Sequence, residues 1–169
     1  MLYLKAANYG DIEKEYLFVR DIPVEENSFT NEWHGVSRED FERVALRAMI
    51  DNSKGINLPE GYVPDTTLFL WNDDEIVGQF RIRHHLCPSL AEGAGHIGYF
   101  IGKEHRGKGY GTEGLRLALE EARKIVPEEE IYLRVDRHNT PSLRVMLKNG
   151  GYIHHEDEQK YYVRIRKKR

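Results

Sequence analysis

The sequence is poor in cysteine: its 169 residues include only Cys87. A single thiol excludes an intramolecular disulfide framework, and the first ten residues show neither the basic leader nor the apolar run of a secretory signal. We therefore expect a protein of the reducing cytoplasm. Cys87 precedes Pro88 in a short loop-like stretch with no helix start to lower its pKa, so we interpret it as a structural thiol.

Long apolar runs and an excess of one charge are also missing. No apolar stretch approaches the roughly 20 residues that a membrane-spanning helix requires. The 25 Lys and Arg residues nearly balance the 28 Asp and Glu residues, and both signs are spread along the chain. Neither nucleic acid nor a membrane is therefore an expected partner. No internal repeat, low-complexity segment or long linker divides the chain, which predicts a single domain over residues 1–169.

The sequence does contain an alternation of short apolar strands and amphipathic helices. Strand patterns predict seven strands, at residues 2–5, 65–71, 75–83, 96–101, 131–135, 152–155 and 161–165. Helical spacing and capping residues predict four helices, at 11–19, at 37–52, from the glycine-rich turn up to Pro127, and from 139 or 140 to 148. This order predicts an α/β fold of the α+β type, a mixed sheet with helices on its faces.

A glycine-rich turn between a strand and a helix carries the clearest functional signal. It runs from Gly102 to Thr112, with glycine at 107, 109 and 111. This spacing lets backbone N–H groups converge without side-chain obstruction, and the following helix adds the positive end of its dipole. Arg106 and Lys108 bring two positive charges to the same place, so the turn is predicted to bind a phosphate or pyrophosphate. A tight turn that needs glycine for geometry alone is the alternative.

Two other phosphate-binding patterns match this turn only in part. Gly102, Gly107 and Lys108 fit the opening of a nucleoside-triphosphate loop, but Gly109 stands where a Ser or Thr hydroxyl must bind magnesium. Residues 109–114 fit the dinucleotide fingerprint in letters, but a charged spacer separates them from the preceding strand. A nucleotide-binding domain built on these glycines stays an alternative.

Residues 97–111 resemble the central motif of the GNAT superfamily of acyl-CoA-dependent N-acyltransferases. That motif places the pattern Arg/Gln-x-x-Gly-x-Gly/Ala after a hydrophobic strand, and its three defined places are taken here by Arg106, Gly109 and Gly111. The family's second motif is similar to Asn139-x-x-Ser142 followed by Val145-Met146-x-Lys148-x-Gly150. The resemblance covers almost the whole chain and implies a GNAT-like fold, with a central, mostly antiparallel sheet of about seven strands and helices on both faces.

The resemblance also implies a site for acetyl-CoA as acyl donor, with no metal ion. The backbone of Tyr99, Phe100 and Ile101 would pair with the pantetheine arm, which would enter where strands 97–101 and 131–135 splay apart. Main-chain donors would hold the pyrophosphate, and they come from Arg106, Gly107, Lys108, Gly109, Tyr110, Gly111 and Thr112. Asn139 and Ser142 would reach the pantetheine amides or the phosphate, while a helix cap explains Asn139 equally well.

By the same resemblance we expect an N-acetyltransferase that acts on a primary amine of a small molecule or peptide. The main-chain N–H near Ile101 would stabilise the oxyanion. His96 is a candidate base because imidazole titrates near neutral pH, and a structural histidine is the alternative. Met146 stands where the family often has a tyrosine that protonates the leaving thiolate, so Tyr161 or Tyr162 is a candidate acid. Met146 also leaves open an acyl-CoA-binding sensor without turnover, and a homodimer is compatible with the sequence.

Overall fold

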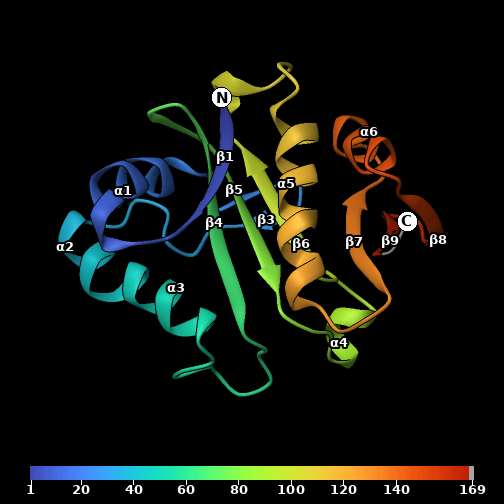
Figure 1. The fold of residues 1–169 in the computed structure, drawn as a ribbon, viewed down its shortest axis with the longest axis horizontal. Helices are drawn as coiled ribbons and strands as arrows, with labels where there is room; N and C mark the ends of the chain where they lie inside the picture. Colours follow the sequence, from blue (N-terminus) through green and yellow to red (C-terminus); the bar gives the residue numbers. More distant parts are fainter. Residues whose placement is uncertain (168–169) are drawn as a thin grey trace.

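The structure, a computed structural model, describes residues 1–167, so the last two residues of the predicted domain, Lys168 and Arg169, lie outside it. Within the described residues, seven longer strands form two antiparallel sheets (Figure 1). The first sheet has the order β1-β4-β5-β6, with β1 Leu2–Ala6, β4 Asp65–Asn72, β5 Glu75–Arg83 and β6 Ile97–Ile101. The second has the order β7-β9-β8, with β7 Glu130–Asp136, β8 Tyr152–Glu156 and β9 Lys160–Arg166. The mixed α/β architecture is confirmed.

The two sheets meet where β6 and β7 begin. These two strands run in the same direction (Figure 1), and the backbone N–H of His96 donates to the carbonyl oxygen of Tyr132 at 2.7 Å. Within residues 1–167 no further backbone hydrogen bond joins β6 to β7. The strands are therefore held together at one end only, as a splay between them requires.

Helices cover both faces of the sheets. On one face of the first sheet lie α1 Ile12–Asp21, α2 Arg38–Asp40 and α3 Leu46–Ser53, with the π-helical turn Phe41–Ala45 between the last two. On the opposite face lie α5 Tyr110–Ile125 and α6 Thr140–Lys148, while α4 Pro88–Ala91 is a single turn. Two 3₁₀ turns, Tyr9–Asp11 and Lys103–His105, precede α1 and α5. In the described part of the chain, no helix is both long and apolar enough to span a bilayer.

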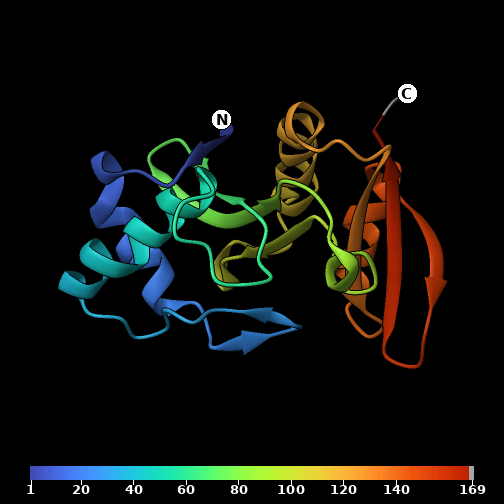
Figure 2. The ribbon, with the colours of Figure 1, turned by 90° about the horizontal axis from the view of Figure 1, so that it is seen from below.

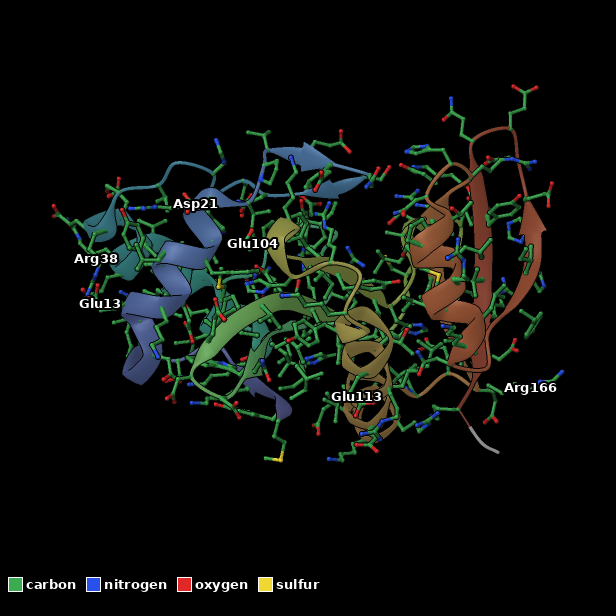
Figure 3. The ribbon with its side chains drawn as sticks, turned by 90° about the horizontal axis from the view of Figure 1, so that it is seen from above. Glu13, Asp21, Arg38, Glu104, Glu113 and Arg166 are labelled. Carbon is green, nitrogen blue, oxygen red and sulfur yellow. The ribbon has the colours of Figure 1, made fainter. Side chains whose placement is uncertain are left out.

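Capping side chains set the helix boundaries much as expected. The Ser37 hydroxyl accepts a hydrogen bond from the Asp40 N–H at 3.1 Å and begins α2. Asn139 caps α6, and Gly150, with a φ of +88°, follows its end. On the surface, Arg38 of α2 lies 2.6 Å from the carboxylate of Glu13 on α1 (Figure 3), and an exposed pair of this kind contributes little free energy.

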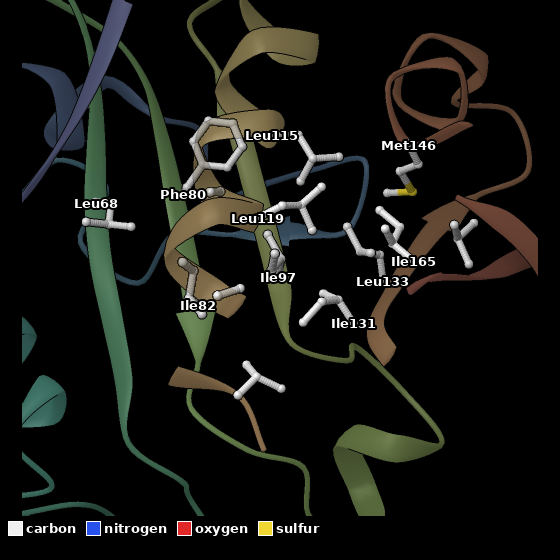
Figure 4. Packing of buried hydrophobic residues seen from close by; sticks show 14 of the residues in the cluster. Leu68, Phe80, Ile82, Ile97, Leu115, Leu119, Ile131, Leu133, Met146 and Ile165 are labelled. Atoms are coloured by element: carbon white, nitrogen blue, oxygen red, sulfur yellow. The ribbon is translucent and has the colours of Figure 1, made fainter. Parts of the chain in front are cut away.

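The main core lies between α5, α6 and the two sheets (Figure 4). Leu115 and Leu119 of α5 are fully buried against Phe80 of β5 and Leu133 of β7. A Cβ at Gly114 would lie 2.7 Å from the Phe80 ring, so this glycine is needed for helix packing. Packing in the core therefore explains why a glycine stands at position 114, where it also matches the dinucleotide fingerprint.

A short ribbon, β2 Glu25–Glu26 and β3 Phe29–Thr30, was not predicted. Its turn residues Asn27 and Ser28 both have positive φ, as a two-residue type I′ hairpin demands. In Figure 2 the ribbon projects from the N-terminal half toward the second sheet. There the Ser28 hydroxyl donates to Asp136 at 2.8 Å, so the ribbon bridges the two halves of the molecule.

Candidate active site

The glycine-rich turn presents a row of backbone donors with no acceptor. Within residues 1–167, no N–H from Gly107 to Thr112 makes a hydrogen bond, and α5 begins at Tyr110 without a side-chain cap at Gly109. Gly107 and Gly109 have φ values of +77° and +83°, which direct successive N–H groups to one side. Unsatisfied donors at the positive end of a 16-residue helix are suited to bind an anion.

The Arg106 side chain does not point at this row of donors. Its Nε donates to the carbonyl oxygen of Ile101 at 2.9 Å, and its Nη2 lies 2.7 Å from the carboxylate of Glu26. The guanidinium also covers the Phe100 ring at 5.1 Å. The predicted positive charge of Arg106 at the anion is therefore wrong for its side chain, because Arg106 ties the turn to the β2–β3 ribbon. Lys108 is exposed and, in the part of the chain that the structure describes, makes no ion pair.

One edge of β6 is open along the splay. Hydrogen bonds from Arg83 to the oxygen of His96 and from Gly102 to the oxygen of Val77 show which residues of β6 pair with β5. Because pairing alternates along an antiparallel ladder, Phe100 turns its backbone toward β5, while Tyr99 and Ile101 turn theirs toward the gap before β7. The prediction that the Phe100 backbone contacts pantetheine is therefore wrong, whereas the contacts of Tyr99 and Ile101 stay as predictions.

Tyr99 and Ser142 meet across this region. The Tyr99 hydroxyl lies 2.6 Å from the Ser142 hydroxyl, and burial raises the pKa of Tyr99 to about 12. The Asn139 amide oxygen accepts from the Ser142 N–H at 3.4 Å, so Asn139 acts as the cap of α6. Ser142 therefore contacts β6 through Tyr99, and the side-chain oxygen of Asn139 is engaged at the start of α6.

His96 is fully buried, and both of its ring nitrogens are engaged. Nδ1 accepts from the Tyr132 N–H at 2.9 Å, so Nε2 carries the proton and donates to Glu128 at 3.0 Å. Burial lowers the pKa of His96, against the opposing effect of the Glu128 hydrogen bond. The ring has no free lone pair for a substrate proton, which argues against the predicted base and favours the structural alternative.

The two candidate acids differ in their surroundings. The Tyr162 hydroxyl donates to Asp157 at 2.9 Å, and its ring stacks on His155 at 4.3 Å. The Tyr161 hydroxyl makes no hydrogen bond within residues 1–167, and its ring lies under the guanidinium of Arg137 at 4.9 Å. Tyr161 also packs against the core that α5 and α6 cover. Of the two, Tyr161 has the free hydroxyl on the side of the glycine-rich turn.

Sequence reasoning missed a group of arginines on the opposite face of the sheets. Arg81 and Arg83 on β5 and Arg134 on β7 alternate with residues of the main core, so they face away from α5. Gly98 of β6 pairs with Arg81, and nothing lies within 4 Å of the position its Cβ would take. The sequence signal for this group is a glycine, Gly98, on a strand that lies between two strands with arginines. That signal can be recognised only once the order of the strands is known.

Known structures share this fold. The ribosomal-protein-S5-alanine acetyltransferase of Vibrio fischeri matches with a TM-score of 0.71 and 16% identity, over 99% of this chain and 93% of that chain. The Campylobacter jejuni N-acetyltransferase PseH, solved in complex with acetyl coenzyme A, matches with a TM-score of 0.60 and 15% identity, over 98% of this chain and 99% of that chain. At such identities the likeness establishes the fold.

Sequence comparison assigns the family. The probable N-acetyltransferase YjcK of Bacillus subtilis is 32% identical over 98 residues, which are 58% of this chain and 52% of YjcK, so the match spans about half of that relative. The family model described as an acetyltransferase (GNAT) domain matches residues 13–151. This match includes the glycine-rich turn and the α6 motif and covers most of the chain, which therefore belongs to the GNAT acetyltransferase family.

Proposed function

We propose that this protein is a cytoplasmic, single-domain enzyme that transfers the acetyl group of acetyl-CoA to a primary amine of a small molecule or peptide. The observation that carries the proposal is the row of unpartnered N–H donors at residues 107–112. A diphosphate accepts several such hydrogen bonds at once and is stabilised by the dipole of α5. Family membership and the acetyl coenzyme A bound to PseH support the choice of this diphosphate carrier.

The open edge of β6 serves the rest of the coenzyme in this proposal. When bound, acetyl-CoA supplies an activated carbonyl carbon to the amine. The outward backbone groups of Tyr99 bind the amides of the pantetheine arm, and Asn139 and Ser142 line its path from α6. The Ile101 N–H donates to the carbonyl oxygen as negative charge develops there.

Two protons must move for an amide to form. The amine loses a proton as its nitrogen attacks the carbonyl carbon, and the thiolate gains one as the carbon–sulfur bond breaks. Tyr161 is proposed as the acid because its hydroxyl is free. Water takes the amine proton, since both nitrogens of His96 are occupied.

The test is thiol release from acetyl-CoA with a broad panel of amines, together with calorimetric titration of the coenzyme. Release that depends on the amine supports the enzyme. Tight coenzyme binding without product across the panel contradicts it and favours the acyl-CoA sensor that Met146 suggests. Displacement of acetyl-CoA by ATP or NAD at comparable concentration would instead favour a nucleotide-binding domain.

A further inference from the structure

The arginine-bearing face of the sheets lies directly across from the coenzyme side. Hydrogen bonding of His96 to Tyr132 joins the starts of β6 and β7, and Gly98 and Arg134 each lie two residues beyond this junction on their own strands. Gly98 also pairs with Arg81 of β5 on its other side. The space above Gly98 is open, because no atom lies within 4 Å of where a Cβ would be.

Two guanidinium groups converge on one turn beside this space. Arg83 Nη1 donates to the carbonyl oxygen of Gly95 at 3.2 Å, and Arg134 Nη1 lies 3.6 Å from the position of a Cβ on Gly93. Gly95, with a φ of +72°, approaches so closely that a Cβ would lie 2.3 Å from the oxygen of Tyr132. The packed turn thus holds both guanidinium groups at the same edge of the open space.

Among the described residues, neither of these two arginines has an ion-pair partner. Arg81 is neutralised by Asp65, whose carboxylate accepts from it at 2.6 and 2.8 Å. Within residues 1–167, neither Arg83 nor Arg134 has a carboxylate within 4 Å. Burial, and then the neighbouring charge of Arg81, lower the pKa of Arg83 to about 10. Half-buried cations without an acid partner cost free energy that a bound anion would offset.

From this geometry we propose that Arg83 and Arg134 bind a carboxylate of the acceptor above Gly98. The inference rests on the proposed acetyltransferase function and names its substrate class: amines that also carry a carboxyl group. A guanidinium is suited to this role because its planar donors match the two oxygens of a carboxylate. Polyamines such as spermidine bring only positive charge to this face and are poor acceptors.

The spacing along β6 leaves room between the carboxylate and the reacting amine. Gly98 and Ile101 are three residues apart, about 10 Å along a strand. The acceptor panel therefore includes both α-amino acids and ω-amino acids of increasing length, each with its amide as the matched neutral compound.

The experiment compares each acid with its amide by calorimetry on the CoA-loaded protein and by thiol release from acetyl-CoA. The acid is expected to bind, and to be acetylated with a kcat/KM, at least about tenfold better than its amide. In the Arg134→Gln variant, the affinities and kcat/KM values for the acid and for its amide are expected to differ by no more than about twofold. In Arg134→Lys, the acid-to-amide ratio is expected to be intermediate. Arg47→Gln, which removes an exposed arginine on α3, keeps the wild-type ratio.

Equal binding of acid and amide by the wild-type protein, or no binding of any acid, would overturn the inference without any variant. If acetyl-CoA binds but no amine is acetylated, the proposed function fails. The calorimetric comparison of acid and amide still decides whether Arg83 and Arg134 bind a carboxylate.

Discussion

At the scale of single residues, His96 shows how one side chain can join two sheets. Its ring lies at the narrow end of the splay, where it accepts from the Tyr132 backbone and donates to Glu128. A lone pair and a proton are both used for structure. The residue that the family resemblance offered as a base therefore acts as the joint between β6 and β7.

Replacing His96 with alanine is expected to lower the free energy of unfolding by about 2–4 kcal/mol, because the Tyr132 N–H and Glu128 lose their partner in a buried place. Urea unfolding measures this loss, with the exposed His85→Ala as control. The pH profile of kcat/KM should keep its shape. A displaced limb of that profile in a folded His96 variant would restore the histidine as a base.

A second prediction concerns Tyr161. Replacement by phenylalanine removes only the free hydroxyl, so kcat is expected to fall by about 10²-fold while acetyl-CoA affinity stays within about twofold. Tyr162→Phe is the matched control, since that hydroxyl is already bonded to Asp157. Equal kcat values for the two variants would remove Tyr161 from the acid role.

At the scale of elements, a buried carboxyl group attaches α1 to the segment that follows β1. Glu15 is fully buried and accepts from the Asn8 N–H at 3.1 and 3.3 Å. Burial raises its pKa from 4.5 to about 8. A carboxyl with a folded pKa above its unfolded value contributes stability that is fully present below the unfolded pKa and is lost as pH rises through the folded one.

The corresponding prediction is that the free energy of unfolding falls between about pH 4.5 and pH 8 through this group. Glu15→Gln cannot ionise, so its stability relative to wild type should rise by as much as about 4 kcal/mol from about pH 5 to about pH 8.5. Thermal unfolding at the two pH values measures the difference, with the exposed Glu158→Gln as control. Parallel pH dependence of Glu15→Gln and wild type would refute the assignment.

Most elements could be predicted from the sequence because their patterns are long and local. The hairpin of β4 and β5, the capped start of α2 and the stop of α5 before Pro127 each follow from adjacent residues. The β2–β3 ribbon could not be predicted, because strands of two residues show no alternation and the turn Asn27-Ser28 lacks glycine. It is supported by the distant partners Arg106 and Asp136.

Only the backbone part of the candidate site could be predicted from the sequence. Glycine spacing indicates where N–H groups gather, whereas side-chain roles depend on contacts across the sheets. Arg106 pairs with Glu26, and His96 pairs with Glu128, because the strands and the ribbon bring these residues together. A single sequence does not reveal that arrangement. The pair Arg83 and Arg134, which makes no ion pair among the described residues, could not be predicted for the same reason, since the two residues lie on different sheets.

At the scale of the whole molecule, two sheets are joined at one end by His96 and at the other by the β2–β3 ribbon (Figure 2). Between these joints, β6 keeps a free edge, with α5 and its row of donors on one face and Arg83 and Arg134 on the other. By our two proposals, this arrangement would bring acetyl-CoA and an amine that carries a carboxylate to opposite sides of the same opening.

The central claim is that the donors at residues 107–112 bind the diphosphate of acetyl-CoA, and calorimetry with two ligands tests it most directly. S-acetylpantetheine carries the thioester and the pantetheine arm without the diphosphate, so it should bind at least about 100-fold more weakly than acetyl-CoA. Lys108→Glu should weaken acetyl-CoA binding at least about tenfold, while the exposed control Lys54→Glu should not. Equal affinity for the two ligands, or no heat with acetyl-CoA, would contradict the account.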